Sequence, residues 1–128
     1  MGQVCRQIVA QVPDKVGRLA ELADKIRDAG VNIRALLAWT EGLIAKLLMV
    51  ADDNEKAREA IRPMMDISAF GEVVCTKAPN TPGALAEIAH KLAGAGINIR
   101  MVYAVPWDAS EATIILDTTD NAKAAKLV

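Results

Sequence analysis

The chain has 128 residues and a formal net charge of -1, which gives no long-range attraction for nucleic acid or anionic lipid. No apolar stretch reaches the roughly 18 residues that span a bilayer, and the N-terminus has no signal-peptide pattern. Cys5 and Cys75 form neither a CxxC pair nor a metal-ligand cluster. We therefore expect a cytoplasmic protein in a reducing setting, with no cofactor, metal, nucleic-acid partner or membrane contact.

The first half of the chain predicts a strand, a helix, two strands and a helix. Apolar β-branched residues mark the strands, and apolar residues at helical spacing mark the helices. Gly30 is placed to end the first helix in a left-handed conformation. The expected strands are 3–12, 31–39 and 43–50, and the expected helices are 19–29 and 53–64.

The second half repeats this order but stops early. Residues 67–78 read as the last strand of a first copy, the first strand of a second copy, or both in sequence around Gly71. The later expected elements are a helix over 81–95, strands over 97–105 and 111–118, and a short helix from Asp120. The chain then has no room for a final strand, so we expect the second copy to lack it.

An internal repeat supports this reading. Residues 13–38 align with residues 79–104 at a fixed offset, with 13 of the 26 positions identical. Strand, helix, strand, strand, helix, strand is the ferredoxin-like βαββαβ plan. We expect an α+β protein with repeats over 1–70 and 71–128.

The strand over 43–50 is apolar on both faces except for Lys46. Helices cover only one face of the sheet in a two-layer fold, so the open face needs a cover. We expect a homodimer or higher homo-oligomer. The alternative is that the two copies in one chain cover each other.

The loops that lead into the two long helices are the candidate binding loops. Each combines Asp14 or Asn80 with Gly17 or Gly83 just before the helix. Free backbone N–H groups at a helix start attract an anion such as a carboxylate, and glycine leaves room for it. The alternative is that Asp14 and Asn80 only cap the helices.

Other functions of small α+β domains fit these residues poorly. An RNA-recognition domain needs aromatic side chains on its first and third strands, and residues 3–12 and 43–50 contain none. A copper-chaperone-like module needs two cysteines in its first loop, and neither loop has one. The single histidine, His90, aligns with Asp24 and is expected to be solvated, so we expect no enzyme.

The two loops and their helices resemble the ACT domain, an amino-acid-sensing βαββαβ module. NTPGALAEIAHKLAGAGINIRMVYA is close to the family pattern, and DKVGRLAELADKIRDAGVNIRALLA departs from it at Val16, where the family usually has proline. The resemblance covers nearly the whole chain as a tandem pair. It is similar to small stand-alone two-ACT proteins and more distantly to acetolactate synthase small subunits.

The resemblance implies an amino-acid ligand at an interface between ACT domains. It places the ligand at the loop before the first helix and at the asparagine that begins the second strand. The implied ligand-binding residues are Asp14, Lys15, Gly17, Arg18, Leu19 and Asn32 in the first copy, and Asn80, Thr81, Pro82, Gly83, Ala84, Leu85 and Asn98 in the second.

The function predicted from the sequence is a non-catalytic regulatory protein that binds a small amino acid. The alternative is a ligand-independent regulatory or stabilising subunit of an amino-acid biosynthetic enzyme. Asn80 and Asn98 favour the first function, whereas Val16 and the expected loss of the last strand favour the second.

Overall fold

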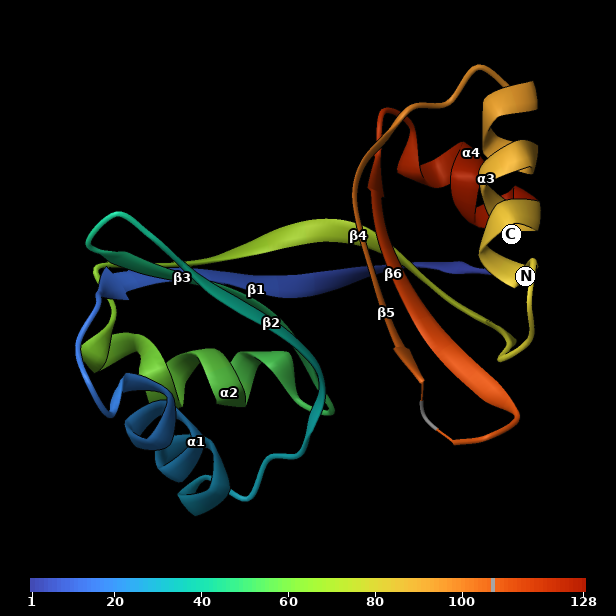
Figure 1. Ribbon diagram of the computed structural model, residues 1–128. Coiled ribbons are helices and arrows are strands. Elements are labelled where there is room, and N and C mark those ends of the chain that lie inside the picture. The colour runs from blue at the N-terminus through green and yellow to red at the C-terminus, as the bar shows by residue number, and fades with distance from the viewer. Residues whose placement is uncertain (107) are drawn as a thin grey trace. The chain divides into compact units, whose positions relative to one another are not determined.

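The computed structural model describes residues 1–106 and 108–128, which form an antiparallel six-stranded sheet and four α-helices. The hydrogen-bonded strand order is β2-β3-β1-β4-β6-β5, and Figure 1 labels each element. Within the described residues, no helix is both long and apolar enough to cross a bilayer. The elements are β1 (Gln3–Pro13), α1 (Arg18–Asp28), β2 (Ile33–Glu41), β3 (Ile44–Ala51), α2 (Asn54–Ile61), the 3-10 turn η1 (Arg62–Met64), β4 (Ile67–Pro79), α3 (Ala84–Gly94), β5 (Ile99–Pro106), β6 (Glu111–Thr118) and α4 (Asn121–Leu127).

The chain divides into two compact units. The first unit is Arg6–Gly71, and the second unit joins Met1–Cys5 to Glu72–Val128. The strands β1 and β4 therefore contribute residues to both units. This division accounts for the double role expected of residues 67–78, because β4 passes from the first unit into the second after Gly71.

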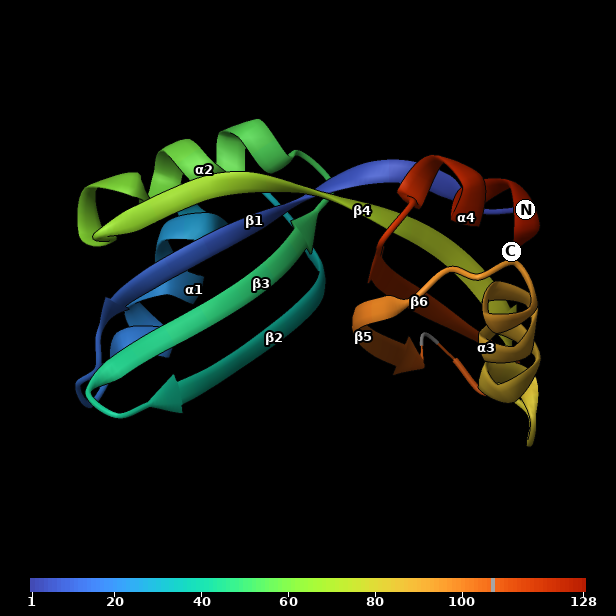
Figure 2. The same cartoon turned by 90° about the horizontal axis from the view of Figure 1, so that it is seen from above.

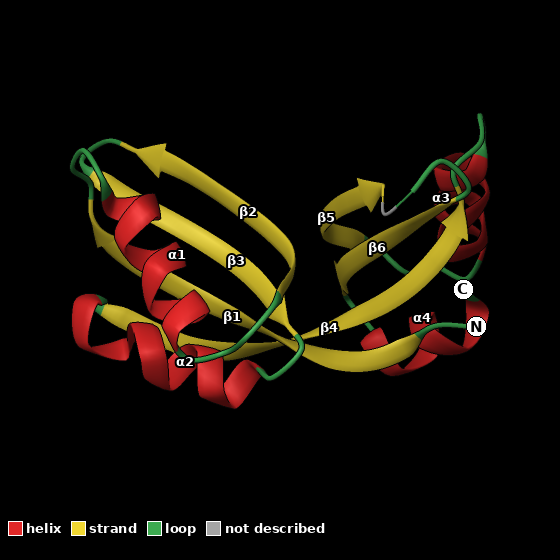
Figure 3. Ribbon diagram, turned by 90° about the horizontal axis from the view of Figure 1, so that it is seen from below, coloured by secondary structure: helices red, strands yellow, loops and turns green. Residues whose placement is uncertain are grey.

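The first unit is a ferredoxin-like βαββαβ fold. Its strand order is β2-β3-β1-β4, and both neighbours of β3 run antiparallel to it. The helices α1 and α2 lie on one face of these strands, as Figures 2 and 3 show from opposite sides. Ile8, Leu22, Met49 and Ile61 are almost fully buried between helices and sheet. Each such side chain contributes about 1.5 to 3 kcal/mol.

Side chains on β3 alternate between the two faces of the sheet. Leu47 and Met49 are buried on the helix side, while Leu48 and Val50 are half-buried on the other side. Leu37 of β2 lies opposite Leu48 in the register and is 37% exposed. The side of the first unit's sheet away from its helices is therefore apolar and partly open to solvent.

The second unit has the corresponding order from β4 through α3, β5, β6 and α4. Its core contains Val74, Ile88, Leu92 and Leu116. Helix α3 begins at Ala84 rather than near residue 81, because residues 81–83 form a turn in which the N–H of Ala84 donates to the carbonyl of Thr81. The expected helix after Asp120 is confirmed as α4.

The second repeat was expected to lack its final strand, which would leave the edge of its first strand open, and that edge is instead covered. Residues of β1 lie next to β4 in the strand order, and Met1–Cys5 belong to the second unit. Gly2 packs closely against Val74 and Val128. The missing strand is thus supplied by the beginning of the chain, a pairing that the order of elements along the sequence does not reveal.

Cys5 of β1 and Cys75 of β4 form a disulfide in the second unit, with their Cα atoms 6.2 Å apart. Disulfides are rare in reducing compartments, so this pair argues against the reducing setting that the separated cysteines suggested. The cytoplasmic location stays a prediction.

Candidate functional site

The loop between β1 and α1 leaves the start of the helix uncapped. Gly17 occupies the N-cap position with a φ of 89°, a left-handed conformation that favours glycine, and no side chain caps the helix. Asp14 is therefore not a helix cap. In the described part of the chain, the backbone N–H groups of Leu19 and Ala20 have no hydrogen-bond acceptor. These groups can bind an anion.

Strand register brings the end of β2 to the same end of the first unit as this loop. Pro13 at the end of β1 lies opposite Ile44, and Ile44 lies opposite Glu41 at the end of β2. The last residues of β2 and the first residues of β3 therefore lie beside the loop that leads into α1.

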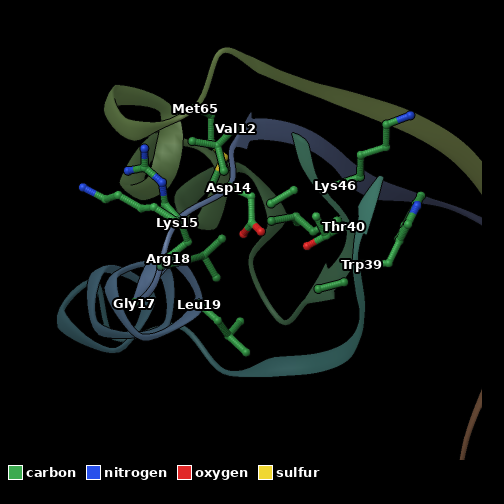
Figure 4. A pocket seen from close by; sticks show the side chains of 14 residues that line it. Val12, Asp14, Lys15, Gly17, Arg18, Leu19, Trp39, Thr40, Lys46 and Met65 are labelled. Atoms are coloured by element: carbon green, nitrogen blue, oxygen red, sulfur yellow. The ribbon is translucent and has the colours of Figure 1, made fainter. Parts of the chain in front are cut away.

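A cavity of about 280 Å³ lies between these segments, entirely within the first unit. Residues of β1, the loop, α1, β2 and β3 form its walls, together with the residue that follows η1. Figure 4 shows their side chains. The lining residues are Val12, Asp14, Lys15, Gly17, Arg18, Leu19, Leu22, Ala38, Trp39, Thr40, Ala45, Lys46, Leu47 and Met65.

Some of the charged side chains around the cavity are paired with other protein groups, and others are not. The guanidinium of Arg18 donates from Nε to the carbonyl of Pro13 at 2.9 Å and pairs with Glu21 at 3.5 Å. The ammonium of Lys46 pairs with Glu41 at 2.6 Å. Figure 4 shows Lys15 pointing away from the cavity.

Asp14 differs from Arg18 and Lys46 because its carboxylate, like the ammonium of Lys15, has no ion-pair or hydrogen-bond partner among the described residues. Its carboxylate points into the cavity, toward the hydroxyl of Thr40 across it (Figure 4). The free charge inside the cavity is therefore negative. Such a group binds an ammonium through a charge-assisted hydrogen bond.

The loop between β4 and α3 has the same backbone but different side-chain contacts. Gly83 has a φ of 87°, and α3 also starts without a side-chain cap. The amide of Asn80, however, donates to the carbonyl of Asp108 at 3.4 Å. Hydrogen bonds within the segment before β6 also stabilise it, because Ser110 donates to the carboxylate of Asp108 from Oγ and N at 2.7 Å. Asn80 is thus engaged where Asp14 is free.

The asparagines at the starts of β2 and β5 do not join these loops within a unit. The backbone N–H of Asn32 donates to the carboxylate of Asp52 at 3.1 Å, and the N–H of Asn98 donates to the hydroxyl of Thr119 at 3.0 Å. Helix α1 has 11 residues and spans about 16 Å. It separates Asn32 from Asp14, and Asn32 does not line the cavity.

The structure thus gathers part of the predicted site and adds residues that the sequence did not indicate. Asp14, Lys15, Gly17, Arg18 and Leu19 all line the cavity. The added residues come from the far wall, formed by β2, β3 and the segment after η1. The register of the hairpin formed by β2 and β3 would have indicated the residues from these strands, but sequence spacing alone does not determine that register. The main additions are Trp39, Thr40, Lys46 and Met65.

Comparison with protein-family models gives no match, and no curated protein matches the chain. Solved structures do match. Protein BT0572 from Bacteroides thetaiotaomicron has a TM-score of 0.89 and 24% sequence identity, over 98% of this chain and 87% of that chain.

Two regulatory subunits of aspartate kinase have a similar structure. The ligand-free subunit from Thermus thermophilus has a TM-score of 0.70 and 16% identity, over 98% of this chain and 93% of that chain. The subunit from Thermus flavus has a TM-score of 0.67 and 17% identity, over 98% of this chain and 90% of that chain. At these identities the likeness establishes the fold, which is an ACT-like, ferredoxin-like α+β fold.

Proposed function

We propose that this chain is a non-catalytic regulatory protein that binds a small amino acid in the cavity beside the start of α1. The observation that carries the proposal is the combination of an unpaired carboxylate, a hydroxyl and an uncapped helix start around one cavity. A free amino acid offers one ammonium and one carboxylate, which complement these groups. Two proteins of similar fold are regulatory subunits of aspartate kinase, which agrees with a regulatory role.

We also propose that the protein forms a homodimer or higher homo-oligomer. The support is the sheet face of the first unit, where Leu37 and Leu48 lie opposite each other away from the helices. An apolar sheet face of this kind is stabilised by an isologous contact with a second copy. The other predicted contacts lie outside this cavity, and we propose that they belong to a separate ligand site that such an assembly would complete. They are Asn32, Asn80, Thr81, Pro82, Gly83, Ala84, Leu85 and Asn98.

The proposed partner of the regulator is an amino-acid biosynthetic enzyme. Its support is the similarity in fold to the two aspartate kinase regulatory subunits. Ligand binding would act on that partner only through a difference in affinity between two arrangements, typically worth 1 to 3 kcal/mol.

A second candidate function is a ligand-independent regulatory or stabilising subunit. The observation that favours it is the second loop, where Asn80 bonds to the carbonyl of Asp108. A loop held by its own hairpin has a structural role without any ligand. The ligand-independent function would replace the amino-acid-binding function if no amino acid binds.

Calorimetric titration with each of the twenty amino acids, up to 10 mM, separates the two functions. We expect at least one to bind with a dissociation constant of roughly 1 µM to 1 mM. Ala38→Phe places a large side chain in the cavity and should abolish that binding. Ala104→Phe is the matched control, because Ala104 aligns with Ala38 and is likewise exposed. Absence of heat from all twenty amino acids would overturn the proposal.

A further inference from the structure

We infer that the cavity selects an amino acid with an apolar side chain of about leucine or methionine size and holds its ammonium on Asp14. This inference rests on the proposed function and adds the class of ligand and the repeat that binds it. It follows from the walls, the charges and the size of the cavity.

The floor of the cavity is apolar. Val12, Leu22 and Leu47 line it and are each less than 10% exposed. Leu19 also lines it and remains 55% exposed. An apolar ligand side chain would remove the exposed surface of Leu19 from water and pack on the apolar floor, whereas a polar side chain would meet no partner on the floor.

The charges exclude acidic and basic side chains. An acidic ligand side chain would lie near the free carboxylate of Asp14. The guanidinium of Arg18 and the ammonium of Lys46 are already paired with Glu21 and Glu41, and the unpaired Lys15 points away from the cavity (Figure 4). A basic ligand brings two cations to one free carboxylate, so one of them would face the apolar floor without a partner. An apolar amino acid requires one anion only, and Asp14 supplies it.

The size of the cavity favours a side chain larger than that of glycine or alanine. Its volume of about 280 Å³ is nearly twice the roughly 150 Å³ of an apolar cavity that binds benzene. Glycine or alanine would leave much of this volume unfilled. A branched or thioether side chain fills more of it while the ammonium reaches Asp14 and the carboxylate lies at the uncapped start of α1.

The second repeat lacks this combination of groups. At the aligned positions, Asn80 replaces Asp14 and Pro106 replaces Thr40, so both the anion and the hydroxyl are absent. The amide of Asn80 is also engaged by the carbonyl of Asp108. Ligand selection therefore belongs to the first repeat.

The test is calorimetry of the full chain with leucine, methionine, aspartate, lysine and N-acetyl-leucine as probes. Leucine and methionine should bind, and aspartate and lysine should bind at least tenfold more weakly. N-acetyl-leucine, which has no ammonium, should lose at least tenfold in affinity. Asp14→Asn should weaken leucine binding by about 10- to 100-fold. Asp24→Asn, the same change on an exposed residue of α1 that pairs with Arg27, is the control and should leave binding unchanged.

Each failure has a distinct meaning. If aspartate or lysine binds more tightly than leucine, the ligand class is wrong while the proposed function stands. If leucine binds equally well to the wild type and to Asp14→Asn, the role of Asp14 is wrong. If none of the twenty amino acids binds, the proposed function itself fails and this inference fails with it.

Discussion

Cys5 and Cys75 join the beginning of the chain to β4 across 70 residues of sequence. Two apolar side chains ahead of the disulfide are largely exposed, because Met1 is 96% exposed and Val4 is 44% exposed. Little apolar burial holds this segment on the second unit. The disulfide is therefore an important constraint on it.

Replacement of both cysteines, Cys5→Ser with Cys75→Ser, should lower the free energy of unfolding by about 3 to 4 kcal/mol, because the disulfide closes a long loop in the unfolded chain. Urea unfolding of both proteins, with and without reductant, measures this. Reductant should bring the wild type to the level of the variant and leave the variant unaffected. Equal stability of the oxidised wild type and the variant would contradict the prediction.

Replacement of Gly17 or Gly83 by alanine should destabilise the protein because of the backbone conformation at these positions. A Cβ at Gly17 or Gly83 would meet no atom within 4 Å, yet both residues have a positive φ. Each change to alanine should therefore cost about 1 kcal/mol. Gly94→Ala is the control, since Gly94 is helical and equally uncrowded, and it should stabilise the protein by about 0.5 to 1 kcal/mol. Destabilisation by all three changes would show that crowding matters.

Removal of the side chain that caps α2 should lower the stability of the protein, whereas removal of the free carboxylate of Asp14 should not. The Asp53 side chain accepts a hydrogen bond from the N–H of Lys56 at 3.0 Å, so Asp53→Ala should cost about 1 kcal/mol. Asp14→Ala should change stability by less than about 0.5 kcal/mol, because Asp14 caps nothing. A large loss of stability in Asp14→Ala would restore the capping role.

The turn before β6 should lose stability in acid. Hydrogen bonds from Ser110 hold the pKa of the Asp108 carboxyl below its ordinary value. Its contribution is therefore present above the unfolded pKa of about 4 and is lost as pH falls through the lower folded pKa. Unfolding of the wild type and Asp108→Asn from pH 6 to pH 2 should give a stability difference that shrinks as pH falls. A constant difference would contradict it.

The repeat and the local elements were predictable because their signals are local. Apolar spacing placed α1 within a residue of its observed bounds, and Gly30 has the expected positive φ of 73°. The first strand was harder to place, because its opening residues belong to the second unit and its remainder to the first. Periodicity identifies a strand but does not identify its neighbours.

Part of the site escaped prediction for the same reason. Asp14 and Gly17 are recognisable within one loop, but Thr40 reaches the cavity only through the register of two hairpin strands.

Sequence spacing also did not indicate a matched pair of asparagines. Asn54 accepts from the N–H of Ala51 at 2.8 Å, and Asn121 accepts from the N–H of Thr118 at 2.8 Å. Their offset is one residue longer than that of the aligned segments, because the hairpin of β5 and β6 is one residue longer than that of β2 and β3.

The most direct test of amino-acid binding in the first repeat is a titration with leucine followed by the backbone amide resonances of both loops. Leucine should shift the amides of Gly17, Leu19 and Ala20, whose N–H groups lie at the uncapped start of α1. The aligned amides of Gly83, Leu85 and Ala86 should stay in place. Shifts confined to the second loop, or no shifts in either loop at 10 mM leucine, would contradict the account.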